Sequence, residues 1–144
     1  MPPVAFHFNV ADPIDYVCRL VRKVRARQLT LVVCAEPADV ADIDQRLWTL
    51  APLAFLAHST LGAPDMVRAR SPVLLCTQWN GQDTRQVLVN LRAELPEHGG
   101  RFERLVEIVP TDEPSRAAAR QRWRSYVAQG IAPERHDVGA APQH

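Results

Sequence analysis

The sequence predicts a single α/β domain with a mostly parallel or mixed sheet. An alternating strand pattern at residues 4–10 is followed directly by a helical pattern, and a continuous apolar run at residues 29–35 is followed by another. Repeated strand–helix order is typical of α/β folds. The 144 residues, 47% of them hydrophobic, are enough to bury the core of one domain without disulfides or a structural metal.

The first strand and helix are predicted by alternation and by capping. The stretch "VAFHFNV", residues 4–10, alternates and is rich in β-branched and aromatic residues, as strands are. Asp12 is placed to cap a helix that has Pro13 at its first position. Apolar residues then recur at helical spacing as far as about Arg27, at Ile14, Val17, Cys18, Val21 and Val24.

The second strand and helix follow the same order. The stretch "LTLVVCA", residues 29–35, is a β-branched apolar run typical of a strand covered on both faces, which implies a parallel neighbour. Pro37 begins a helix that ends near Leu50. Its N-terminal half carries acids, which the helix dipole favours there: Glu36, Asp39, Asp42 and Asp44.

The rest of the chain predicts four further strands and a helix. Strand patterns occur at 53–59, 72–78, 86–91 and 102–110, separated by loop signals at Pro64, Pro72, Asn80 and Gly81. Pro114 begins the helix in "EPSRAAARQRWRSYVAQG", residues 113–130. Beyond residue 131 no periodicity remains. We therefore expect a domain over 1–131 and a mobile tail over 132–144.

Composition limits the classes of function. Lys plus Arg number 17 and Asp plus Glu 16, so the net charge of +1 creates no long-range field and electrostatic recognition must be local. Cys18, Cys34 and Cys76 lie in apolar runs without a C-x-x-C pair, which predicts buried free thiols in a reducing compartment. No signal peptide or spanning segment is visible, so we expect a cytoplasmic protein that does not enter membranes.

The sequence contains no recognisable catalytic set. The first strand-to-helix turn, "NVADP", has none of the glycines with which such turns approach phosphates, and a P-loop is missing too. Asp12, Asp15 and Glu36 could hold Mg²⁺ in a small metal-dependent phosphoesterase. The alternative for the same residues is capping and dipole stabilisation of two helices. We expect no cofactor.

The basic helix is the first candidate binding site. At 100° per residue, Arg116, Arg120, Trp123 and Val127 share one face, with Ala119 and Tyr126 alongside and Arg124 at the edge. Two guanidinium groups beside an aromatic ring suit a short acidic peptide with an apolar end. An ordinary solvated helix face and direct binding of single-stranded nucleic acid are the alternatives.

The apolar passage over residues 46–61 is a second candidate surface. The stretch "RLWTLAPLAFLAHSTL" holds more large apolar side chains than one loop usually buries, Trp48 and Phe55 among them. Large aromatic residues at the exposed end of a helix act as anchors for a partner. Ordinary core packing is the alternative.

Several of these stretches resemble a known family. The similarity covers most of residues 4–131 and lies in "VAFHFNV", "LTLVVCAE", "DQRLWTLAPLAFLAHS" and "ERLVEIVPTDEPSRAAARQRWRSYVAQG". In these stretches the chain resembles the chi subunits of the bacterial DNA polymerase III holoenzyme, which belong to the clamp-loader assembly. The "LW" followed by "FLAHS" and the "VP" followed by "R-x-x-x-R-x-x-W" are the more specific parts.

The resemblance implies a fold and a role. The fold would be a Rossmann-like three-layer α/β/α domain without nucleotide chemistry. The protein would be a non-catalytic adaptor between single-stranded DNA-binding protein, whose acidic C-terminal tail it binds, and the psi subunit of the clamp loader. Some family members also engage a repair helicase at the psi surface. Contact with DNA would be mainly indirect.

The resemblance also assigns roles to individual residues. Arg116, Arg120 and Trp123 would form the tail site, with Val109 at its edge. Arg120 would take the terminal carboxylate of the tail, Trp123 its last aromatic side chain, and Arg116 the acidic residues before it. Trp48 and Phe55 would anchor psi or the helicase.

Overall fold

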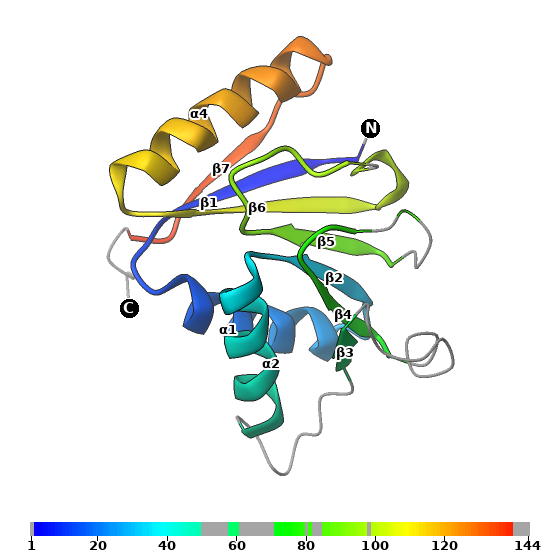
Figure 1. The fold of residues 1–144 in the computed structure, drawn as a ribbon. Helices are drawn as coiled ribbons and strands as arrows, with labels where there is room; N and C mark the ends of the chain where they lie inside the picture. Colours follow the sequence, from blue (N-terminus) through cyan, green and yellow to red (C-terminus); the bar gives the residue numbers. More distant parts are fainter. Residues whose placement is uncertain are drawn as a thin grey trace, which may run out of the picture.

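A seven-stranded sheet forms the centre of the molecule (Figure 1). The computed structural model describes residues 2–49, 58–60, 71–79, 81, 85–97 and 99–139, and for 58–60 the backbone alone. The strand order is β3-β4-β2-β5-β6-β1-β7, and every pair of neighbours is parallel. The strands are β1 (Val4–Val10), β2 (Leu31–Cys34), β3 (His58–Thr60), β4 (Val73–Cys76), β5 (Val87–Asn90), β6 (Arg104–Pro110) and β7 (Glu134–Asp137).

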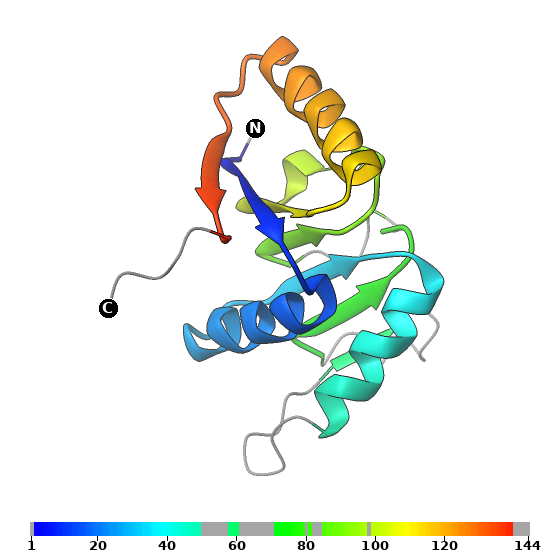
Figure 2. The same ribbon diagram turned by 90° about the vertical axis from the view of Figure 1, so that its left-hand side faces the viewer.

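Helices cover both faces of this sheet (Figures 1 and 2). The described helices are α1 (Pro13–Ala26), α2 (Pro37–Thr49) and α4 (Glu113–Ala128), with a 3₁₀ turn over Gly99–Arg101. Val17 of α1 and Ile43 of α2 pack on one face with Val33. Tyr126 of α4 packs on the other face with Val32. The predicted three-layer α/β/α architecture is therefore confirmed. The sequence left open whether the sheet is mostly parallel or mixed, and all the described strand pairs are parallel.

The central strands explain why the sheet can be parallel. All residues of β2, β4 and β5 are buried, as expected for strands covered on both faces. Successive residues of a strand point to opposite faces, so one continuous apolar run supplies both cores. The predictions of strands in 29–35, 72–78, 86–91 and 102–110 are confirmed, with each end moved by two residues or fewer.

Capping begins α1 and α4 where the sequence predicts. Asp12 Oδ1 accepts a hydrogen bond from the Asp15 N–H at 3.1 Å, with Pro13 at the first helical position. Asp112 Oδ2 accepts from the Ser115 N–H at 3.0 Å, and Pro114 follows. Each cap pairs an N–H that has no partner within the helix. The start of α4 fixes which of its side chains turn towards the sheet.

The chain after residue 131 adds a strand that the sequence pattern did not predict. Residues 134–137 form β7, which pairs in parallel with β1 at the edge of the sheet. All four of its residues are exposed, so no alternation of apolar and polar residues marks the strand in the sequence. The Val138 N–H also donates to Phe8 O at 3.0 Å. The mobility of 132–144 and a domain boundary at 131 stay predictions.

Other sequence predictions divide between the described and the undescribed parts of the chain. The three cysteines are buried and free, as predicted, and the sulfurs of Cys34 and Cys76 lie 3.2 Å apart. Of the strand predicted at 53–59, only its end coincides with β3, because residues 53–57 lie outside the described ones. Among the helices that the structure describes, none is long and apolar enough to cross a membrane.

Candidate functional site

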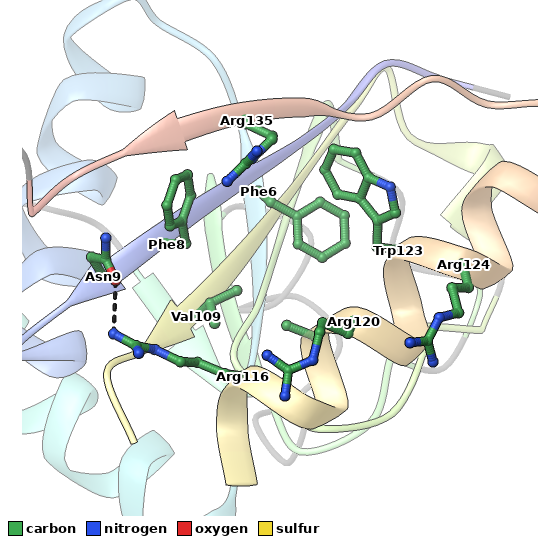
Figure 3. Close-up of a pocket in the computed structure, with 10 residues that line it drawn as sticks. Phe6, Phe8, Asn9, Val109, Arg116, Arg120, Trp123, Arg124 and Arg135 are labelled. Carbon is green, nitrogen blue, oxygen red and sulfur yellow. Dashed lines mark hydrogen bonds between the residues drawn. The ribbon is translucent and has the colours of Figure 1, made fainter. Parts of the chain in front are cut away.

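A groove of about 590 Å³ lies between α4 and the strands β1, β6 and β7 (Figure 3). Side chains from all four elements line it. They are Phe6, Phe8, Asn9, Val109, Arg116, Ala119, Arg120, Trp123, Arg124 and Arg135. We call this set the α4 groove.

The α4 groove brings together the four residues assigned to a tail-binding site from the sequence. Val109 is buried near the end of β6, just before the chain enters α4. Arg116, Arg120 and Trp123 lie at helical spacing on the face of α4 that turns towards the strands. Val127, predicted on the same face, is 52% exposed and does not line the groove.

Aromatic rings form the apolar wall of the groove. The ring centroids of Phe6 and Trp123 lie 5.1 Å apart, and those of Phe6 and Tyr126 lie 5.9 Å apart in an edge-to-face arrangement. Such pairs bury large apolar area with defined ring orientations. Phe6 and Phe8 were not among the predicted site residues. Their alternation in "VAFHFNV" could have shown that both point to one face of the sheet.

Arg116 is held at one end of the groove by Asn9. Arg116 Nη2 donates to Asn9 Oδ1 at 2.9 Å, the bond drawn in Figure 3. Asn9 Nδ2 donates in turn to Asp137 Oδ1 at 2.9 Å. Asn9 has φ of 62°, in the left-handed region that Asn tolerates better than most residues. One residue of β1 thereby connects α4 to the end of β7 and orients Arg116.

The remaining arginines make the groove cationic. Arg120 forms an ion pair with Glu113, and both side chains are exposed. The guanidinium of Arg135 lies 5.0 Å from the centre of the Phe8 ring, within cation–π range. Arg135 was not predicted as a site residue, because the sequence did not reveal the strand that carries it. Arg116, Arg120, Arg124 and Arg135 all line one groove.

Arg122, the other arginine of the basic helix, does not belong to this surface. Its side chain is 5% exposed, and its Nε donates to Glu107 Oε1 of β6 at 2.9 Å. Glu107 also accepts from Tyr126 Oη at 2.7 Å and from Asn90 Nδ2 at 2.9 Å. Arg122 lies three residues from Ala119 and four from Tyr126, so the three share one face of the helix. This spacing could have placed Arg122 on the buried face.

The proposed metal ligands have structural partners instead. Asp12 caps α1, Asp15 pairs with Arg19 at 3.0 Å, and Glu36 lies 3.5 Å from Arg92. No group of three or more His, Cys, Asp or Glu side chains that could hold a metal ion occurs in the described residues. The geometry favours capping and ion pairing for these carboxylates.

The second predicted surface is described only in part. Trp48 lies near the end of α2 and is 54% exposed, one of two large apolar side chains exposed in the described part of the chain. Phe55 lies outside the described residues. The helix that carries Trp48, α2, lies on the far side of the sheet from α4 (Figure 2).

The fold and the α4 groove define an α/β domain with a cationic groove that aromatic side chains line. Comparison with protein families identifies the particular family. The model of the family described as "DNA polymerase III chi subunit, HolC" matches residues 1–134. The chain belongs to this family.

Curated relatives agree with that assignment. The chain is 33% identical to the DNA polymerase III subunit chi of Pseudomonas aeruginosa over 130 residues, covering 88% of this chain and 89% of the relative. It is 27% identical to the protein of that name from Haemophilus influenzae over 129 residues, with 87% of each chain covered. The Escherichia coli protein is 24% identical over 117 residues, covering 80% and 78%. The family is one of accessory, non-catalytic subunits of DNA polymerase III.

Proposed function

We propose that this protein is a replication adaptor whose α4 groove binds the acidic C-terminal tail of single-stranded DNA-binding protein. Through its Trp48 surface it would bind psi, which connects it to the clamp loader. The adaptor would act in the cytoplasm and would need no cofactor. Membership of the chi family supports the replication role.

The observation that carries the tail assignment is the pairing of arginines with aromatic rings in one groove. A tail that ends in an aromatic residue after several acids needs an apolar pocket with cations around it. The Phe6–Trp123 pair offers the apolar wall, while Arg116 and Arg120 stand a turn apart beside it. Arg120 would take the terminal carboxylate, and Arg116 the acids that precede it.

The ion pair of Arg120 with Glu113 supports an exchange mechanism. Both side chains are more than half exposed, so their attraction is weakened by solvent. A carboxylate of the tail can replace Glu113 without leaving Arg120 unpaired. The groove would then exchange an internal acid for the acid of the partner.

Removing the guanidinium of Arg120 should weaken tail binding. We expect Arg120→Ala to cost about 1.5–3 kcal/mol of binding free energy, because charged hydrogen bonds in a partly shielded site are lost. The measurement is fluorescence anisotropy of a labelled acidic peptide ending in Pro-Phe. Arg22→Ala, which removes one exposed charge from α1, is the control and should bind as the wild type does.

Removing the competing acid should have the opposite effect. Glu113→Gln keeps the size of the side chain but releases Arg120 and takes away a charge that repels an acidic peptide. We expect affinity for the same peptide to rise by about twofold to fivefold, the range of an exposed ion pair. If Arg120→Ala folds normally and binds with unchanged affinity, or if Glu113→Gln weakens binding, the tail site lies elsewhere.

The Trp48 surface is proposed as the site for psi, with a repair helicase as the other possible occupant. An exposed Trp at a helix end is a frequent anchor in protein interfaces. Trp48→Ser should abolish co-elution with psi in size-exclusion chromatography while leaving tail binding intact. A variant that still co-elutes would contradict this assignment.

A further inference from the structure

A second hollow of about 630 Å³ lies on the face of the sheet opposite to the α4 groove. Its walls are α1 and the strands β1, β6 and β7, and Figure 2 shows α1 on the side of these strands away from α4. We call it the α1 groove. Neither the tail site nor the Trp48 surface includes it.

Four cations line the α1 groove, and one of them, Arg135, also lines the α4 groove. The other three belong to the α1 groove alone. Lys23 and Arg27 come from the end of α1, and Arg104 is the first residue of β6. All three are exposed, and none forms an ion pair with any residue that the structure describes. The helix dipole accounts for cations near the end of α1. It gives no reason for Arg104, which converges on the same hollow from the sheet.

Two other basic residues of α1, Arg19 and Arg25, are already engaged. Arg19 pairs with Asp15 at 3.0 Å, and Arg25 donates to Leu29 O at 2.9 Å. Glu134 is the acid that lines the hollow. The balance of charge in the α1 groove is therefore positive, although the whole chain is nearly neutral.

Planar rings line the same hollow. The rings of His7 and His136 are 4.8 Å apart with an angle of 30° between their planes. His7 Nδ1 is 2.6 Å from Tyr16 Oη. Burial of the ring is the main reason that the pKa of His7 is lowered to about 4, and His136, Arg104 and Lys23 lower it further. Cations and flat rings in one hollow suit a ligand that carries both phosphates and bases.

We propose that the α1 groove binds a single strand of nucleic acid, with its phosphodiester backbone along Lys23, Arg27 and Arg104. A volume of 630 Å³ lies within the size range of sites for small molecules and admits a short stretch of flexible strand. A duplex holds its phosphates on a stiff cylinder that does not enter a hollow between a helix and a sheet. This function is additional to tail binding and does not depend on it.

The test is the affinity of the full chain for a labelled oligothymidylate of about ten nucleotides, within the site sizes of single-strand-binding folds. We expect the double variant Lys23→Ala/Arg104→Ala to bind about tenfold more weakly at low salt. Loss of two phosphate contacts should also flatten the slope of log affinity against log salt by about 1.4. The control is Arg22→Ala, on the same helix but outside the groove, and it should bind as the wild type does.

Four outcomes of these binding measurements would overturn the proposal, and a fifth, with an α4 variant, would relocate the site. The four are no binding at low salt, equal weakening by Arg22→Ala, equal affinity for a duplex of the same sequence, and displacement by inorganic pyrophosphate at matched ionic strength. Displacement by pyrophosphate would mean that the α1 groove binds free phosphates and not a nucleic-acid strand. Loss of strand binding in Arg116→Ala instead would move the site to α4. The double variant should keep its affinity for the acidic peptide, which separates this test from that of the tail site.

Discussion

Glu107 and Arg122 form a buried ion pair whose neighbours determine what it contributes. Burial raises the pKa of Glu107, while Arg122 and the hydrogen bonds from Tyr126 and Asn90 oppose that shift. Burial and the nearby Glu107 also raise the pKa of Tyr126. Arg122 Nη1 donates to Ala93 O at 3.0 Å as well. The network joins α4 to β5 and β6 and so supports the wall of the α4 groove.

Breaking this pair from one side should be costly. Arg122→Met leaves the Glu107 carboxyl buried without its cation, and we expect a loss of about 3–5 kcal/mol in the free energy of unfolding. Adding Glu107→Gln, which removes the charge but keeps an acceptor for Tyr126, should restore about half of that loss. Urea unfolding measures both. A double variant no more stable than Arg122→Met would contradict the role of the buried charge.

His7 should make stability depend on pH. Its folded pKa of about 4 lies below the ordinary 6.5, so between these values the unfolded chain binds more protons. The free energy of unfolding should therefore fall as pH drops from 6.5 towards 4. Discounted for the partial exposure of the ring, the full loss is about 1–2 kcal/mol.

A variant isolates this contribution from that of other titrating groups. His7→Gln cannot take up a proton in this range and keeps a polar partner for Tyr16. Urea unfolding at pH 7.5 and pH 5 should show a smaller loss of stability in the variant than in the wild type. Equal losses would mean that His7 is not the group responsible.

At the scale of elements, β7 completes both grooves. It pairs with β1 over four residue pairs, and Arg135 and His136 point from it to opposite sides of the sheet. Gly139 packs so closely on Asn9 that an added Cβ would lie 2.7 Å from the Asn9 Cβ. A strand without any buried residue therefore positions side chains of both proposed sites.

Deleting β7 separates its contributions. A chain ending at Ile131 should still unfold cooperatively, in keeping with the predicted domain, but should melt several degrees lower because β1 loses its outer neighbour. Tail binding should weaken, since Arg135 and the Asp137 partner of Asn9 are removed. Circular dichroism and peptide anisotropy measure the two effects. A chain that fails to fold would show that the domain extends past residue 131.

At the scale of the whole molecule, the proposed sites use different faces. The α4 groove lies on one side of the sheet, whereas Trp48 and the α1 groove belong to the other. The α4 groove and the Trp48 surface share no residue, and such sites usually contribute independently. The arrangement suits a protein that holds two partners at once.

Independence can be measured directly. We expect the affinity for the acidic peptide to change by less than about twofold when psi is saturating, and Arg120→Ala to leave psi binding unchanged. Isothermal titration calorimetry with and without the other partner gives both values. Competition between the peptide and psi would place the two sites on one surface.

Local sequence pattern was enough to predict several elements of this protein. A cap and helical periodicity predicted α1, a proline at the start predicted each of α2 and α4, and β-branched runs predicted the central strands. The face of α4 that carries Arg116, Arg120 and Trp123 also follows from 3.6-residue periodicity. All of these features depend on residues within one or two helical turns of each other.

Only the tertiary structure decided the strand order, the existence of β7 and the burial of Arg122. Each depends on the pairing of distant segments: β7 on β1 across more than a hundred residues, and Arg122 on Glu107 of another element. Local pattern cannot reveal which strand is the neighbour. Both grooves arise where such segments meet, so Phe6 and Arg135 become neighbours of α4 only through the parallel sheet.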